Sequence, residues 1–279
     1  MRALTRFFAI TFVVSWALWL LAATVPANFP GRAALFLPGT VTPALAALWL
    51  TISNEKKAGA RALLRRLVAW RVSPGWYVLA LGYMAGIKVV AALIQRAITG
   101  EWPAFGSMPV LLLFLGALVS TPAQAGEEVG WRGYALLRMA AAIGLRWSSI
   151  LLGVVWAAWH LPLFFIRGGD LAGQSFPVFL LDVTALSVAF SYLYERTNGS
   201  LLLVMLLHAA VNNTTGIVPA CVEANGMFGM QASIMGWITG LLLWITAAYF
   251  LWRMPPRLDI SGRTNYLPAA PGHCETARA

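Results

Sequence analysis

Long apolar runs separated by short polar stretches follow one another along most of the chain. A helix needs about 20 predominantly apolar residues to cross the hydrocarbon core of a bilayer, and these runs have that length. The pattern predicts eight membrane spans, at Arg6–Val25, Ala33–Ile52, Gly75–Ile98, Pro109–Arg138, Trp147–Ile166, Phe176–Tyr194, Ser200–Val218 and Ser233–Trp252. The predicted fold is therefore all-α, a polytopic membrane helix bundle of about eight transmembrane helices.

The fourth run differs from the others because it carries a proline and two adjacent carboxylates. Its apolar part, PVLLLFLGALVS, leads into Thr121-Pro122, and a proline removes a backbone donor and kinks or breaks a helix. The stretch AGEEVGWRGYALL follows it. We therefore expect a second helical piece after the break, and this piece carries Glu127 and Glu128.

A polar stretch between the second and third runs has its own periodicity. Residues 56–71, KKAGARALLRRLVAWR, place leucine, valine and tryptophan side chains against arginines at helical spacing. Such a helix lies in the membrane interface with its apolar face toward the lipid. We interpret it as an amphipathic interfacial connector in preference to a partner-binding helix.

Composition and charge support a membrane protein and orient it. Hydrophobic residues make up 59% of the chain and charged residues only 11%, against roughly a quarter charged in soluble proteins. With the N-terminus inside, the inner side collects 16 of the 20 Lys and Arg; Lys88 lies within the third span, and the outer side holds only Arg32, Arg96 and Arg167. We expect a multi-pass protein of the cell membrane with both termini cytoplasmic. Its net charge of +10 then reflects topology and anionic lipid, and nucleic acid is not an expected partner.

The domain organisation follows from the same pattern. Residues 1–254 are expected to form one transmembrane domain, and residues 255–279 a polar, disordered cytoplasmic tail. The two cysteines, Cys221 and Cys274, fall on opposite sides of the membrane, so they predict neither a disulfide nor a metal framework. An alternative for the first run is a cleavable signal that ends near Val25-Pro26-Ala27. Its removal would disturb the charge alternation.

Ionisable groups inside the spans are candidates for function, because each one is costly to place in a bilayer. Glu128 and Arg132 are four residues apart on one helical face and can pair, whereas Glu127 points about 100° away and has no local partner. The alternative is a purely structural role, in which both glutamates cap a helix at the membrane surface. The other candidates are Lys88, His160, Asp182, His208, Asn212 and Asn213.

The depths of three of these groups match. At about 1.5 Å per residue, Glu127 lies roughly 16 Å, His160 roughly 19 Å and His208 roughly 12 Å from the inner ends of their helices. Small residues at Gly126, Gly130 and Gly133 let neighbouring helices approach closely. A carboxylate, two imidazoles and the amide of Asn212 at one level predict a water-filled cavity suited to hydrolysis.

Three short motifs occur in order along this region. EEVGWR, residues 127–132, matches EExxxR; His160 closes WAAWH, where FxxxH is expected; and HAAVN, residues 208–212, fits HxxxN. In this respect the chain resembles the CPBP family, the CAAX proteases and bacteriocin-processing enzymes also called ABI proteins. The match covers roughly residues 120–215, and Trp156 replaces the usual phenylalanine, a change of one aromatic for another.

The resemblance implies an intramembrane endopeptidase similar to type II CAAX prenyl proteases, which remove the last three residues of prenylated proteins. Glu127 would be the general base that activates water. Glu128 would be held by Arg132 and help to fix the helix and the water. His160 would bind the water or donate to the leaving amine, and His208 with Asn212 would face the developing oxyanion.

The resemblance leaves the cofactor open. Glutamate and neutral histidine are also zinc ligands, so a zinc-dependent version would use Glu127, His160 and His208. The family is often called metalloprotease, and a glutamate mechanism without metal has also been argued for it. An HExxH helix is absent from the sequence.

Rival chemistries have weaker support. A rhomboid-like serine site would need a GxSG turn, which the sequence lacks, and aspartyl chemistry would need two intramembrane aspartates, whereas only Asp182 qualifies. We predict that Asp182 forms a buried ion pair with Lys88. Two other classes remain: a non-proteolytic membrane immunity or scaffold protein, and a transporter or proton relay. The expected substrate is a membrane peptide or the C-terminal tail of a membrane protein.

Overall fold

The computed structural model describes residues 2–26, 29, 31–219 and 226–255. Over these residues the chain is all-helical, which confirms the predicted fold class. The α-helices are α1 (Arg2–Thr24), α2 (Arg32–Arg65), α3 (Pro74–Thr99), α4 (Val110–Ser120), α5 (Ala125–Gly130), α6 (Leu137–Ile143), α7 (Leu145–Trp159), α8 (Phe176–Arg196), α9 (Leu201–Thr214) and α10 (Ile234–Arg253). The predicted tail from residue 256, Cys221 and Cys274 lie outside the described residues.

Seven helices of the described chain are long and apolar enough to cross a membrane, so this is a multi-pass membrane protein. They correspond to seven of the eight predicted spans. The predicted span Ser200–Val218 is instead a shorter apolar helix, α9, which has 14 residues and continues into the 3₁₀ turn η5 (Thr215–Ile217). Fourteen residues rise only about 21 Å, less than the thickness of a hydrocarbon core.

The fourth span is broken where the sequence predicted. α4 ends at Ser120, and Thr121–Gln124 form a 3₁₀ turn, η2, with Pro122 in its first positions. The helix resumes as α5, continues through one π-helical segment, η3 (Trp131–Leu136), and ends as α6. The glutamates therefore lie just after the break.

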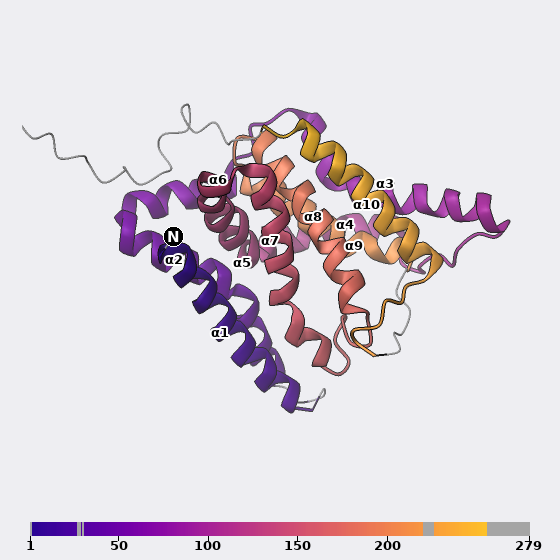
Figure 1. Cartoon of the computed structure of the whole chain (residues 1–279), viewed down its shortest axis with the longest axis horizontal. Coiled ribbons are helices and arrows are strands. Elements are labelled where there is room, and N and C mark those ends of the chain that lie inside the picture. The colour runs from indigo at the N-terminus through magenta and orange to yellow at the C-terminus, as the bar shows by residue number, and fades with distance from the viewer. Residues whose placement is uncertain (1, 27–28, 30, 220–225, 256–279) are drawn as a thin grey trace, which may run out of the picture.

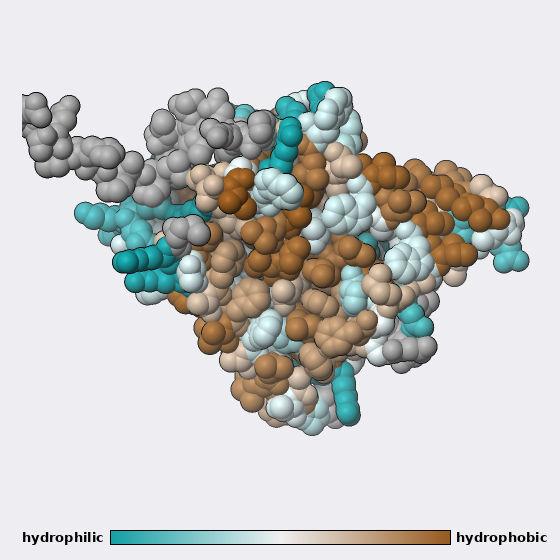
Figure 2. Space-filling model, viewed as in Figure 1, coloured by the Kyte–Doolittle hydropathy of each residue, from teal (hydrophilic) through white to brown (hydrophobic). Residues whose placement is uncertain are grey.

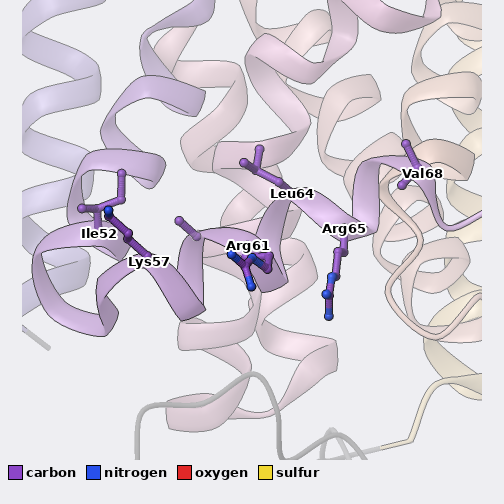
Figure 3. A pocket seen from close by; sticks show the side chains of 7 residues that line it. Ile52, Lys57, Arg61, Leu64, Arg65 and Val68 are labelled. Atoms are coloured by element: carbon purple, nitrogen blue, oxygen red, sulfur yellow. The ribbon is translucent and has the colours of Figure 1, made fainter.

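α2 also contains a break, and this break creates the predicted connector. Lys56 has non-helical backbone angles, φ 59° and ψ −163°, so the helix changes direction there and runs on to the 3₁₀ turn η1 (Arg66–Val68). This connector and the end of the preceding helical piece line an open pocket of about 480 Å³, shown in Figure 3. Its lining is basic and apolar and includes no motif residue: Ile52, Lys57, Ala60, Arg61, Leu64, Arg65 and Val68.

The helices are arranged around a buried centre. α1 and α2 pack side by side at one edge of the bundle, and α3 and α10 lie toward the opposite edge (Figure 1). Between them, α7 packs against α8, α5 against α2, and α9 against α3 and α4. The helices that carry the three motifs thus occupy the middle of the bundle.

Large apolar side chains remain exposed over much of the outer surface. The visible face in Figure 2 is broadly hydrophobic, with hydrophilic residues gathered toward its margins. Several of these side chains are more than two-thirds exposed, among them Val78, Val110 and Val119. An apolar surface of this extent is what a lipid environment accepts.

Lys88 on α3 and Asp182 on α8, which the sequence predicted as a pair, interact electrostatically, and Lys88 is 3% exposed. α10 packs against both α3 and α8, and a Cβ added at Gly240 of α10 would lie 2.9 Å from Asp182 Oδ1. The Asp182 carboxylate therefore lies against the α10 backbone.

Candidate active site

Close helix packing positions the glutamates. A Cβ added at Gly130 would lie 2.5 Å from Pro43 Cβ and 2.7 Å from the Pro43 carbonyl carbon, so a side chain there would separate α5 from α2. A Cβ at Gly126 would lie 3.2 Å from Val41 Cα. The prediction that small residues allow close approach is confirmed for both positions. The helix with the two glutamates is thereby held inside the bundle.

Glu128 and Arg132 form the predicted pair at the start of the π-helical segment. Arg132 Nη1 donates to Glu128 Oε1 at 2.9 Å and to Oε2 at 3.0 Å, and both side chains are 0% exposed. The guanidinium carbon lies 4.3 Å from the ring centre of Trp156 and 4.7 Å from that of Phe190. Single π-helical turns are frequent at functional sites. Here the segment contains Arg132, which balances the Glu128 charge.

His208 of α9 joins this pair. Its Nδ1 lies 2.7 Å from Glu128 Oε1, and the side chain is almost completely buried. A carboxylate accepts, so Nδ1 carries the proton. Nε2 of His208 is then an acceptor in the neutral ring and a donor only in the imidazolium. The oxyanion role expected of His208 therefore requires a second proton on this ring.

Glu127 has a partner that the sequence reasoning missed. The indole Nε1 of Trp156, on α7, donates to Glu127 Oε2 at 2.7 Å. The Trp156 ring also contacts both motif histidines, with ring centroids 5.7 Å from His160 and 5.4 Å from His208. Trp156 is thus the side chain that contacts all three motif helices. The tryptophan at position 156 could have indicated this contact from the sequence, because its indole has an N–H donor that the usual phenylalanine lacks.

His160 follows the last residue of α7 and lies beside Glu127. Its Nδ1 lies 2.8 Å from the Trp156 carbonyl oxygen, so Nδ1 is the donor and Nε2 of a neutral ring is an acceptor. The ring packs against Trp159 at 4.8 Å and Phe179 at 5.4 Å. It also interacts electrostatically with Glu127 and His208. The predicted convergence of the three motifs is therefore observed for Glu127, His160 and His208.

Asn212 differs from the other motif residues because its side chain is exposed. Its neighbour Asn213 points into the bundle instead, where Nδ2 donates to Ser120 Oγ of α4 at 3.1 Å and to the Ala209 carbonyl at 2.8 Å. Asn212 lies one helical turn beyond His208 on α9. The motif amide of Asn212 is therefore exposed, and Asn213 is the amide that forms hydrogen bonds inside the bundle.

The site contains residue types that can bind zinc, but the arrangement of their side chains does not fit an ion. Glutamate and imidazole are suitable ligands, and a zinc site needs three or four of them around one point. Within the described residues, no group of three His, Cys, Asp or Glu side chains is placed to hold a metal. We therefore derive no step through a metal.

Fold and site together define a multi-pass membrane helix bundle with a buried polar centre of glutamate, arginine and histidine. The family model of type II CAAX prenyl endopeptidases, Rce1-like, matches residues 106–214, which include all three motifs. CAAX prenyl protease 2 from Methanococcus maripaludis is 26% identical over 227 residues, which cover 74% of this chain and 81% of that protein. The resemblance inferred from the motifs is confirmed, and these similarities support a CAAX-protease-like endopeptidase.

Proposed function

We propose that the chain is an intramembrane endopeptidase in which Glu127 activates water for attack on a peptide bond. The carboxylate takes a proton from water while the hydroxyl adds to the carbonyl carbon. The carbon–nitrogen bond then breaks, and the same proton passes to the leaving amine. Peptide and water give one acid and one amine, so no other reactant is needed.

The observation that carries this proposal is the convergence of the three motif helices on one buried centre. Glu127 is 8% exposed and accepts one hydrogen bond, from Trp156, whereas Glu128 is 0% exposed and already satisfied by Arg132 and His208. The two adjacent carboxylates thus have different roles. Glu127 is the base, and Glu128 holds Arg132 and His208 in position.

Both imidazoles have a ring nitrogen available for the reaction. In the described chain, the hydrogen bonds of His160 and His208 use Nδ1 alone. Nε2 of neutral His160 accepts from the water that Glu127 deprotonates, so these two groups orient it. Nε2 of protonated His208 and the exposed Asn212 amide are the donors for the oxyanion.

The substrate we propose is the C-terminal tail of a membrane peptide or protein. The archaeal relative is named for CAAX prenyl substrates, and a prenylated tail would enter a site within the bilayer from the lipid. We place the cleaved bond near the cytoplasmic face, because the basic loops favour this orientation. Both termini lie on that side only if the shorter α9 also crosses the membrane, in addition to the seven longer helices, and we propose that it does.

The test is cleavage of quenched peptides by purified protein in detergent. The panel contains prenylated CAAX peptides and other membrane peptides, and the variants are Glu127→Ala and Glu101→Ala. Glu101 lies in the exposed loop after α3 and controls for loss of a carboxylate elsewhere. We expect Glu127→Ala to lower kcat at least about 100-fold and Glu101→Ala to leave it unchanged.

Two outcomes would overturn the proposal. Equal kcat values for wild type and Glu127→Ala would exclude Glu127 as the base. Loss of wild-type cleavage with a zinc chelator, restored by added zinc, would replace the glutamate mechanism by a metal-dependent one. Silence of a correctly folded wild type on the whole panel would favour the immunity or scaffold alternative.

A further inference from the structure

The hydrogen bond between Trp156 and Glu127 is buried and short. It joins α7 to α5 at a donor–acceptor distance of 2.7 Å, with Trp156 4% and Glu127 8% exposed. Within the described chain it is the one hydrogen bond that the Glu127 side chain makes. A bond from a neutral donor to a carboxylate in such surroundings is stronger than one in water.

The indole is held by its surroundings. Arg132 lies over the ring, with its guanidinium carbon 4.3 Å from the ring centre, and Phe190 packs at 5.5 Å. The two motif histidines contact the same ring. With these neighbours the indole cannot rotate without displacing a site residue, so the direction of its N–H is determined by packing.

We infer that Trp156 is a positioning residue for the base, a role that rests on the proposed function. Its N–H occupies Oε2 of Glu127 and leaves Oε1 as the oxygen that takes the proton from water. Without this bond the carboxylate can rotate about its last torsion, which is broad, and either oxygen can turn away from the water. Trp156 therefore acts on the chemical step through Glu127 and does not itself touch the reacting atoms.

Trp156→Phe removes the donor and keeps an aromatic ring. Trp159→Phe is the matched control, because Trp159 lies on the same helix, is 0% exposed and also packs against His160. Its indole nitrogen has no hydrogen-bond partner among the described residues. The two variants thus remove similar volumes from one helix, and only the first removes a bond to Glu127.

The kinetic test compares kcat and KM of the two variants on a peptide that wild type cleaves. A hydrogen bond to a charged group contributes about 1.5–3 kcal/mol, which corresponds to roughly 10- to 100-fold in rate. We expect Trp156→Phe to lower kcat by this factor with KM within about twofold, and Trp159→Phe to stay within about threefold of wild type. Equal losses of kcat in both variants would overturn the inference and indicate packing alone.

A spectroscopic test does not depend on activity. In ¹⁵N-labelled protein in detergent, the indole N–H resonance of Trp156 is the one that disappears in Trp156→Phe. A bond to a carboxylate moves the proton downfield, so Glu127→Ala should move it upfield, and Glu127→Gln, which keeps an acceptor, should move it less. An unmoved resonance in Glu127→Ala would overturn the inference. The resonance can be measured without cleavage, so this test still decides the inference if wild type is inactive and the proposed function fails.

Discussion

The two halves of the broken fourth span have opposite surroundings. In α4, which is apolar up to its last residue, Ser120, only Ala117 is buried. From Gly126 to Leu137, where the two glutamates and Arg132 lie, every residue is buried. A soluble protein would bury the first half and expose the second. In a bilayer the apolar half can face lipid, whereas the polar half needs partners inside the bundle.

The comparison also separates two kinds of stabilisation. Lipid is as apolar as leucine, so α4 gains little from being covered, and its contacts to α9 include the single hydrogen bond from Asn213 to Ser120. The polar half depends on dense packing and on paired charges. Substitutions should therefore be costly after Pro122 and mild before it.

The largest effect is expected from breaking the buried pair. Arg132→Ala leaves Glu128 buried without its guanidinium, and removal of one partner of a buried pair costs about 3–5 kcal/mol. The measurement is the free energy of unfolding in mixed detergent micelles. Arg138→Ala is the control: Arg138 pairs with Glu55, and because these side chains stay 21% and 14% exposed, the loss should be smaller than for Arg132→Ala. Comparable losses in the two variants would refute the distinction.

The next largest difference in unfolding free energy between the two halves of the fourth span is expected for leucine-to-alanine substitutions. Leu136→Ala, at a position 0% exposed, should lower the free energy of unfolding by about 2–5 kcal/mol because it leaves a cavity. Leu111→Ala, at a position 66% exposed in α4, should change it by less than about 0.5 kcal/mol. The same unfolding titration measures both. A costly Leu111→Ala would mean that α4 is covered by protein.

Gly130→Ala tests the close approach of α5 to α2. The added methyl would overlap the Pro43 backbone, and such overpacking costs about 1–3 kcal/mol. Gly86→Ala, in α3, meets nothing within 4 Å and should be neutral or stabilise by up to about 1 kcal/mol, because alanine favours helix. Thermal unfolding monitored by circular dichroism compares the pair. A neutral Gly130→Ala would show that α2 and α5 can separate freely.

The smallest effect is expected in α4 itself. Ser120→Ala removes the side-chain acceptor of Asn213, and interhelical hydrogen bonds in membrane proteins average about 0.6 kcal/mol. Ser53→Ala is matched, because the Ser53 hydroxyl donates only to Trp49 of its own helix. A difference of more than about 2 kcal/mol between the two unfolding free energies would contradict a weakly held α4.

Much of the site could be predicted because it depends on local rules. The Glu128–Arg132 pair follows from helical spacing, and the break before it follows from Pro122. The close approach at Gly130 follows from its missing side chain. These features need only the chain near each residue, and they were predicted correctly.

Other features depend on the rotation and length of helices, which packing decides. Adjacent residues on a helix point about 100° apart, so a modest rotation of α9 determines that Asn213 faces inward and Asn212 outward. Equal depth likewise indicated the electrostatic interaction of Lys88 with Asp182, but it did not show that the Asp182 carboxylate lies against the α10 backbone. Hydropathy alone did not show where α9 ends, so the predicted span Ser200–Val218 is longer than the helix.

The sequence by itself determined the all-helical membrane architecture, the position of the helix break and the Glu128–Arg132 pair, because hydrophobic length, proline and helical spacing act locally. Only the tertiary structure decided which oxygen of Glu127 is held and by what. That bond joins residues 29 apart in the chain, on two helices whose separation and rotation depend on the whole bundle.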